Sequence, residues 1–275
     1  MRDLVRLLLL ELALLQAPSA TAANVGDGHP QASRLARSGR DILIEPSVLA
    51  ADIGNLAGAA QDLAAAGATW VHVDVCDGSR ECCRALSSLG PASIAAIRKA
   101  APSLSIDVHL YVLDPEEHIE VIAAAGADRI TFQIETLGDG GHERARALAK
   151  RIQALGCHAG VCLAPATPVD AVDELCRDGD VDLVDVLAVL PGIGGQSFAT
   201  HGPAALEKVR ELRRRHPMLP YTLVDGGIND ATAEAAAAAG ANALVSGSYI
   251  FRAESREMMG TRLASLKQAL LHHGE

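Results

Sequence analysis

The sequence predicts an α/β protein built as a closed (β/α)₈ TIM barrel, on three observations. From residue 41 onward, short β-rich apolar runs alternate with Ala- and Leu-rich helical stretches, and the unit recurs eight times. The chain has 275 residues, of which 49% are hydrophobic, enough for one large barrel. The first apolar run is followed by Pro46–Ala50, without the glycine-rich turn that usually follows the first strand of a doubly wound dinucleotide-binding fold.

The eight predicted strands are short runs in which apolar residues dominate, separated from one another by helical stretches. In chain order they are Ile42–Glu45, Trp70–Val75, Ser105–Leu110, Arg129–Ile134, His158–Leu163, Leu183–Leu187, Tyr221–Val224 and Ala243–Val245. A helix between consecutive strands is the connection that parallel pairing requires, so we expect a parallel sheet.

Each predicted strand is followed by one predicted helix. These helices are Asn55–Ala66, Pro91–Ala100, Pro115–Ala125, His142–Leu155, Pro168–Cys176, Pro203–Arg215, Asp230–Ala239 and Glu254–His272. Several begin with proline, whose missing N–H costs nothing in the first turn of a helix. Four end before a glycine suited to a left-handed C-terminal cap, namely Gly67, Gly126, Gly156 and Gly240.

Residues 1–40 are predicted to form an N-terminal extension, and residues 41–272 the catalytic barrel domain. Two arginines flank the start of the apolar run Leu7–Leu15, and Ala20–Ala22 resembles a small-residue cleavage site. These features are typical of a targeting peptide. Glu11 interrupts the apolar run, which favours a disordered extension instead, and the run is too short to span a bilayer.

Composition argues against several classes of function. The net charge is −10 and aromatic residues make up 3% of the chain, so the basic face and stacking platform of a nucleic-acid-binding protein are not expected. A Schiff-base aldolase needs a lysine at a strand end, but the lysines all fall in predicted helices: Lys99, Lys150, Lys208 and Lys267. The cysteines fit no zinc-ribbon spacing and are expected to be thiols of a reducing compartment: Cys76, Cys82, Cys83, Cys157, Cys162 and Cys176.

Polar residues gather where the predicted strands end, and this end of a TIM barrel carries the chemistry. Two histidines each lie two residues from an aspartate in one strand, so both members of each pair point to the same face. The seventh strand is followed at once by a further aspartate. We predict that four of these side chains converge on a divalent ion such as zinc, iron or manganese: His72, Asp74, His109 and Asp225. Asp107 lies deeper and either orients a ligand or is a buried structural acid.

A divalent ion flanked by two carboxylates suits one kind of reaction, inversion at a carbon next to a ketone. The ion polarises the carbonyl and stabilises an enediolate. One carboxylate removes the carbon-bound proton, and the other delivers a proton to the opposite face.

Glycine-bearing loops follow the last three predicted strands and indicate phosphate binding. They are Gly192-Ile193-Gly194-Gly195, Gly226-Gly227 and Ser246-Gly247-Ser248. Barrel enzymes often hold phosphate with backbone N–H groups of their late loops, and glycine allows the backbone to approach the oxygens closely. One such loop is weak evidence, but three in neighbouring positions favour a phosphorylated ligand.

Several ordered motifs resemble those of the ribulose-phosphate 3-epimerase family. The resemblance runs from about Ile42 to Leu270, nearly the whole predicted barrel. The matching segments are Glu45–Asp52 (EPSVLAAD), His72–Gly78 (HVDVCDG), Asp107–Leu110 (DVHL), Pro191–Gln196 (PGIGGQ), Val224–Ile228 (VDGGI) and Val245–Ser248 (VSGS).

The resemblance implies a TIM barrel of the ribulose-phosphate-binding type. It implies an isomerase of the pentose-phosphate pathway that converts D-ribulose 5-phosphate to D-xylulose 5-phosphate by inverting C3. One divalent ion (Zn, Fe, Mn or Co) per subunit would be held by His72, Asp74, His109 and Asp225, with Asp74 and Asp225 as the acid/base pair. Substrate contacts are implied at Ser47, His109, Gly192, Ile193, Gly194, Gly195, Asp225, Gly226, Gly227, Gly247 and Ser248.

The sequence departs from the family pattern around the substrate. Methionines that usually line the family's site correspond to Cys76, Tyr111 and Leu187, and a polar residue before Pro-Gly corresponds to Leu190. The loop after the second strand is rebuilt as Ser79–Arg84. Two alternatives therefore stay open: a 3-epimerase of another ketose phosphate such as allulose 6-phosphate, and a catalytically impaired barrel that binds a sugar phosphate.

The expected partner is a small phosphorylated ketose, with no nucleic acid and no membrane, and the resemblance implies a homo-oligomer. The expected location is the cytoplasm. An organellar or secreted protein is the alternative if residues 1–40 are a targeting peptide.

Overall fold

The computed structural model describes residues 42–79, 89–138, 141–190 and 196–272. Some of the predicted features lie outside these ranges: the extension at residues 1–40, nearly all of the rebuilt loop after the second strand, the glycines and isoleucine at 192–195, and the adjacent cysteines at 82 and 83.

Eight parallel strands in the described ranges form the sheet of a barrel, which confirms the predicted fold class. The strands are β1 (Leu43–Pro46), β2 (Trp70–Cys76), β3 (Ser105–Tyr111), β4 (Arg129–Gln133), β5 (His158–Leu163), β6 (Leu183–Leu187), β7 (Tyr221–Asp225) and β8 (Ala243–Ser246). Their order in the sheet is β1-β8-β7-β6-β5-β4-β3-β2. An isolated parallel bridge between Ser47 and His72 joins the two ends of the sheet, so the barrel closes there.

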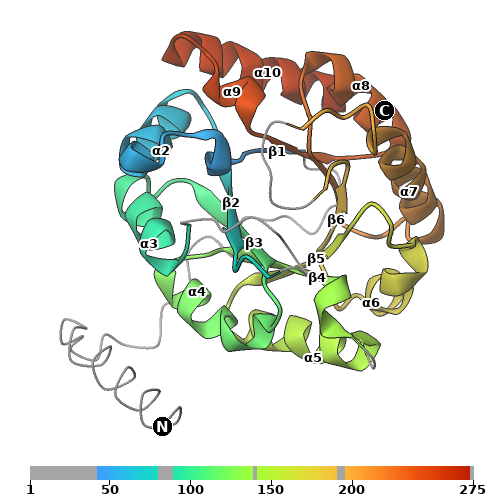
Figure 1. The fold of residues 1–275 in the computed structure, drawn as a ribbon. Helices are drawn as coiled ribbons and strands as arrows, with labels where there is room; N and C mark the ends of the chain where they lie inside the picture. The colour runs from blue at the N-terminus through green and yellow to red at the C-terminus, as the bar shows by residue number, and fades with distance from the viewer. Residues whose placement is uncertain (1–41, 80–88, 139–140, 191–195, 273–275) are drawn as a thin grey trace, which may run out of the picture. The chain divides into compact units, whose positions relative to one another are not determined.

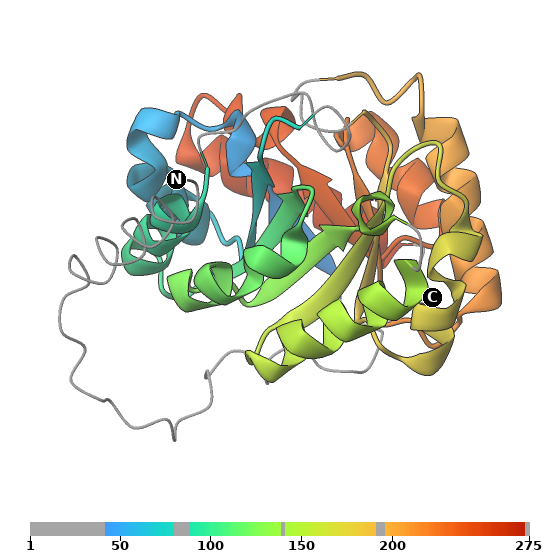
Figure 2. The same cartoon turned by 60° about the horizontal axis from the view of Figure 1, so that its bottom comes forward.

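Helices surround the strands, which lie together at the centre of Figure 1 and run side by side within the helices in Figure 2. The α-helices are α2 (Leu56–Ala65), α3 (Pro91–Ala100), α4 (Ile119–Ala125), α5 (Gly141–Ala154), α6 (Asp173–Asp178), α7 (Gly202–Arg215), α8 (Asp230–Ala239), α9 (Ser248–Phe251) and α10 (Arg256–Leu271). The 3₁₀ helices are η1 (Val48–Ala50), η2 (Ile53–Asn55), η3 (Pro115–Glu117), η4 (Ile134–Leu137) and η5 (Val169–Val172). Within the described ranges, no helix combines the length and apolar character needed to cross a bilayer.

Two predicted helices are divided in the structure. The segment Pro115–Ala125 forms η3 and then α4, with His118 between them at φ −112° and ψ −21°. The predicted helix Pro168–Cys176 forms η5 and then α6. It continues to Asp178, after which Gly179 adopts the left-handed cap conformation at φ +71°. The four glycine caps predicted from the sequence all have positive φ, as expected. The short helices η1 and α9, which follow the first and last strands, were not predicted.

The interior of the barrel changes from apolar to polar along the strand direction. At the amino ends of the strands, inward side chains form an apolar cluster: Leu43, Trp70, Leu183, Tyr221, Leu223, Ala243 and Val245. Successive strand residues point to opposite faces, so the inward positions two residues further along carry the functional side chains. Parallel pairing places His72 level with Asp107, and Asp74 level with His109. The same register brings Leu187 level with Asp225.

Candidate functional site

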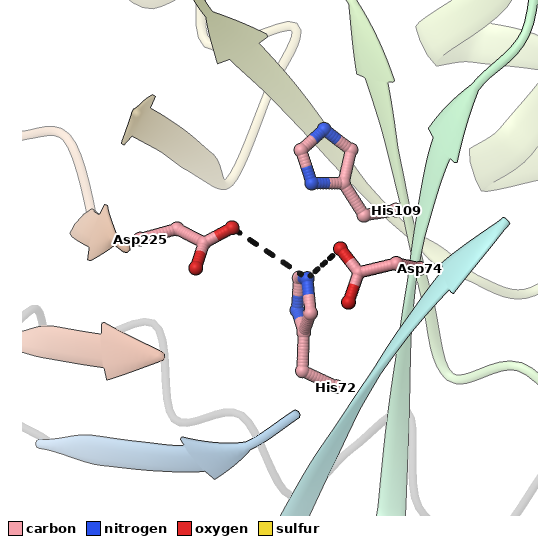
Figure 3. Close-up of side chains that lie close together, drawn as sticks. All are labelled: His72, Asp74, His109 and Asp225. Atoms are coloured by element: carbon pink, nitrogen blue, oxygen red, sulfur yellow. Dashed lines mark hydrogen bonds and ion pairs between the residues drawn. The ribbon is translucent and has the colours of Figure 1, made fainter. Parts of the chain in front are cut away.

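The four predicted ligands converge inside the carboxyl end of the barrel. One donor atom from each of His72, Asp74, His109 and Asp225 lies within 4.8 Å of the others. Figure 3 shows Asp225 and Asp74 approaching from opposite sides of the His72 ring, with the His109 ring above them. The His72 Nε2 atom lies 3.3 Å from Asp74 Oδ1 and 4.0 Å from Asp225 Oδ2.

The depth of these side chains separates two roles. Both imidazoles are fully buried, whereas Asp74 is 5% exposed and the Asp225 side chain is 14% exposed. Only the two carboxylates reach the cavity above, since Asp74 and Asp225 line it and the histidines do not. The histidines are therefore placed to hold an ion on the side away from the cavity, while the carboxylates also face a ligand in the cavity.

A buried network fixes the orientation of His72. Its Nδ1 atom lies 2.9 Å from Asp107 Oδ2, which leaves Nε2 turned toward Asp74 and Asp225. Asp107 also accepts hydrogen bonds from Arg129 Nε and Thr131 Oγ1, each at 3.0 Å. Metal-bound histidines usually donate their second N–H to a carboxylate in this way. Asp107, for which the sequence left two roles open, is both a buried structural acid and the residue that orients a candidate ligand.

Arg129 continues this network across the barrel. It is fully buried, ion-paired to Glu45 and Asp107, and its guanidinium carbon lies 4.6 Å from the centre of the Trp70 ring. Arg129 and Glu45 were not among the predicted site residues, although Glu45 opens the first of the matching motifs. Both occupy inward positions of strands, so a charge at an inward position of a predicted strand was the available signal.

His109 is contacted by residues of β4 and β6. Its Nε2 atom lies 3.1 Å from Gln133 Nε2, and its Nδ1 atom lies 3.4 Å from Asp185 Oδ2. The Nδ1 contact is within ion-pair range but has no hydrogen-bond geometry, and Nδ1 has no hydrogen-bond partner in the described part of the chain. Gln133 and Asp185 were not predicted as site residues, although Asp185 is a charge within an otherwise apolar strand.

The pKa values of the four candidate ligands are shifted in different directions. Burial, followed by the charge of His72, lowers the pKa of His109 to about 3, so its imidazole is neutral. Burial opposes the charge on His72, but Asp74 and the hydrogen bond with Asp107 together raise the pKa of His72 well above its ordinary value. Burial likewise opposes ionisation of Asp74, but the charge and hydrogen bond of His72 lower the pKa of Asp74. Burial raises the pKa of Asp225 to about 7.

These residues fit a divalent ion. Two imidazole nitrogens and two carboxylates are ligands that zinc, iron, manganese and cobalt accept. One ring nitrogen of each histidine and the two carboxylates face one space, so an ion bound there would replace the protons on those nitrogens. A bound ion and a proton on His72 would satisfy the same carboxylates, so we expect metal binding to release a proton.

A cavity of about 820 Å³ opens above the carboxylates. Ser47 lies at its floor and donates a 2.8 Å hydrogen bond to Asp74 Oδ2. The cavity is also lined by the predicted phosphate-binding residues that the structure describes, together with two arginines: Gly226, Gly227, Gly247, Ser248, Arg252 and Arg262. Gly227 is required there, since its φ is +68° and a Cβ atom would lie 2.7 Å from the backbone nitrogen of Phe198.

The side chains that depart from the family pattern do gather at the site. Cys76, Tyr111 and Leu187 form one buried cluster with Cys162. The Tyr111 ring lies on the His109 ring with centroids 3.8 Å apart. Leu190 is 54% exposed and lines the cavity. The wall of the site therefore contains two cysteine sulfurs and the aromatic ring of Tyr111 beside the aliphatic side chain of Leu187.

Comparison with protein families gives one match over most of the barrel. A family described as the ribulose-phosphate 3 epimerase family matches residues 43–251. The chain is 41% identical over 211 residues to the cytoplasmic isoform of ribulose-phosphate 3-epimerase from Oryza sativa, covering 76% of this chain and 87% of that one. It is 36% identical over 234 residues to ribulose-phosphate 3-epimerase from Rhodobacter capsulatus, covering 84% of this chain and 96% of the relative.

Similar solved structures show the fold alone. The tryptophan synthase α subunit of Legionella pneumophila has a TM-score of 0.59 at 14% identity and covers 88% of this chain and 97% of its own. A 3-hexulose-6-phosphate synthase has a TM-score of 0.56 at 19% identity and covers 84% of this chain and 98% of its own.

Proposed function

The chain belongs to the ribulose-phosphate 3-epimerase family, and on that premise we propose that it inverts C3 of D-ribulose 5-phosphate to give D-xylulose 5-phosphate, a step of the pentose-phosphate pathway. One observation carries the proposal. His72, Asp74, His109 and Asp225 converge beside a cavity that is also lined by glycine-bearing loops. The ketone end of a ketose phosphate suits the four side chains, and its phosphate suits the loops.

One divalent ion per subunit (Zn²⁺, Fe²⁺, Mn²⁺ or Co²⁺) is proposed as the cofactor, held by these four side chains. When bound, it supplies the positive charge that polarises the C2 ketone and favours the enediolate.

Asp74 and Asp225 are proposed to move the protons. In the metal-free protein the pKa of Asp74 is lowered, whereas burial raises the pKa of Asp225 to about 7, so the two carboxyls have unlike environments. A pair of carboxyls whose environments push their pKa values apart is suited to acid and base roles. Their approach from two sides in Figure 3 suits removal of the C3 proton from one face and delivery to the other. The roles exchange in the reverse direction.

The other residues bind and orient. Ser47 fixes Asp74 through its hydrogen bond and lies within reach of a substrate in the cavity. The loops at Gly226-Gly227 and Gly247-Ser248 are proposed to bind the phosphate through backbone N–H groups, aided by the charge of Arg252. The 192–195 loop is proposed to complete this site.

The test is proton exchange in D₂O. The metal-loaded protein is incubated with D-ribulose 5-phosphate, and C3 is followed by NMR. We expect deuterium at C3 and the appearance of D-xylulose 5-phosphate. If C3 keeps its proton while the protein is folded and metal-loaded, the pentose assignment is wrong.

Single-carboxylate variants test the two-base mechanism. With Asp225→Asn or Asp74→Asn, the remaining carboxylate serves only one face, so we expect exchange at C3 of one epimer without inversion. Metal content is measured in the same samples, because each variant also loses a ligand. Full turnover by metal-loaded Asp225→Asn would contradict the mechanism.

A second candidate substrate is a six-carbon ketose phosphate such as allulose 6-phosphate. The cavity volume and the changed wall at Tyr111 and Leu190 favour testing it. A comparison of kcat/KM on the two sugar phosphates decides between them.

The remaining proposals concern the domain bounds, the cellular location and the oligomeric state of the enzyme. Residues 41–272 are proposed as the catalytic domain of a cytoplasmic homo-oligomer. An organellar or secreted location is the alternative, tested by the mass of the mature chain and by its size in solution. One plant relative of this chain is named as chloroplastic and another as cytoplasmic.

A further inference from the structure

A second group of potential metal ligands lies inside the barrel, and two of its three members, Cys162 and Asp185, have no role in the proposed reaction. Cys162 on β5 and Asp185 on β6 lie level with each other in the sheet. Donor atoms of His109, Cys162 and Asp185 lie within 4.8 Å of one another. We call these three residues the inner set, and the set His72, Asp74, His109 and Asp225 the outer set.

Asp185 is a buried acid whose oxygens have room for a further partner. It is 1% exposed, and neither of its oxygens accepts a hydrogen bond of ordinary geometry within the described ranges. The thiol of Cys162 and the Nδ1 atom of His109 face it, the latter at 3.4 Å. Burial raises the pKa of Asp185 well above its ordinary value, so without a cation the group keeps its proton, and a cation among these three residues would replace that proton.

Gln133 contacts the two other donors. Its Nε2 atom lies 3.4 Å from Cys162 Sγ and 3.1 Å from His109 Nε2. Because the amide donates to Nε2, the neutral imidazole carries its proton on Nδ1, the nitrogen next to Asp185. Burial raises the pKa of the Cys162 thiol well above its ordinary value. A cation at these three residues would therefore replace the protons on Nδ1 and Sγ, and the Gln133 amide would turn so that its oxygen accepts from Nε2.

We propose that the inner set binds a thiophilic divalent cation, such as Co²⁺, Zn²⁺ or Cd²⁺, through sulfur, nitrogen and oxygen. Nitrogen, thiolate and carboxylate ligands together suit this class of ion. Binding releases the thiol proton of Cys162. Both sets include His109, so an ion at the inner set competes with the ion proposed for the outer set, and one equivalent divides between them.

The test uses Co²⁺, whose near-ultraviolet thiolate-to-metal charge-transfer band reports a bound sulfur. Metal-free protein is titrated with Co²⁺, and the band and the bound equivalents are measured. We expect the band at one equivalent. Cys162→Ser or Cys162→Ala abolishes it, and Asp185→Asn weakens Cd²⁺ binding by about 10- to 100-fold.

Cys157→Ser is the matched control. Cys157 is also a buried cysteine, but its thiol donates to the Ala127 carbonyl away from the site, so the band should persist.

The wild-type spectrum is decisive even if a Cys162 variant fails to fold. Visible Co²⁺ bands without the charge-transfer band overturn the inner set but leave the outer set and the proposed function standing. A charge-transfer band that survives Cys162→Ala, or two equivalents bound together, also overturns the proposal. Absence of any Co²⁺ binding overturns both sets.

Discussion

Replacing Asp225 by asparagine is expected to stabilise the metal-free protein while it removes the proposed acid/base group. Burial raises the pKa of Asp225 from 3.8 to about 7. The unfolded chain therefore ionises this carboxyl near pH 4, whereas the folded chain keeps the proton until about pH 7. Between these values the folded protein binds more protons than the unfolded chain, so stability falls as the pH rises.

The size of the effect follows from the same two values. A difference of about three pKa units corresponds to about 4 kcal/mol above pH 7. This is an upper value, because the Asp225 side chain is 14% exposed and lies 4.0 Å from His72. Asparagine cannot ionise, so we expect Asp225→Asn to exceed the wild type in unfolding free energy by about 1–4 kcal/mol at pH 8 and to differ little near pH 4.

Urea denaturation in the presence of a chelator, at several pH values, measures this difference. Asp114→Asn is the control, because Asp114 is an exposed carboxylate that caps η3 without a side-chain hydrogen bond. With saturating metal the sign should reverse, since the variant has lost a ligand. A variant no more stable than the wild type at pH 8, or a gain that is the same at all pH values, would refute the reasoning.

Three further predictions follow from the site. Asp107→Asn leaves the buried Arg129 charge poorly compensated and should lower the unfolding free energy by about 3–5 kcal/mol, measured by urea denaturation. Gly227→Ala forces a Cβ atom against Phe198 at φ +68° and should raise KM for the phosphorylated ketose more than it lowers kcat; an unchanged KM would separate this loop from substrate binding. Removing metal with a chelator should abolish turnover, and adding Zn²⁺ back at 100 times its Kd should stabilise the fold by about 2.7 kcal/mol, seen as a rise in Tm.

The fold was largely predictable because its signals are local. The runs His158–Leu163 and Leu183–Leu187 coincide with β5 and β6, and each of the other strands differs from its prediction by one residue at one or both ends. Alternating apolar runs and glycine caps suffice to locate such elements. The divided helices were harder to predict, since tight 3₁₀ turns follow Pro115 and Pro168 and a helical pattern cannot distinguish them from a first α-helical turn.

The candidate ligands were found for a similar reason. His72 and Asp74 are two apart in one strand, so local spacing places them on the same face. The residues that support them depend on register between strands that are distant in the sequence. Arg129 meets Glu45 across 84 positions, and Asp185 reaches Nδ1 of His109 from three strands away along the sheet. No local pattern encodes such contacts.

The bridge between Ser47 and His72 lies at the junction of β1 with β2, where the barrel closes. We call this junction the seam, and it includes part of the active-site floor. β2 pairs with β3 over seven residues and β1 with β8 over four. In the described part of the chain, the junction of β1 with β2 holds that isolated bridge, the hydrogen bond from Ser47 to Asp74 and a 3.8 Å contact between Glu45 and His72. Backbone amides along this seam should exchange with solvent sooner than those of β3 or β4. An ion on His72 and Asp74, with a ligand against Ser47, would then stabilise the closed barrel by linking β1 to β2. Saturation with substrate should therefore slow amide exchange at this junction first.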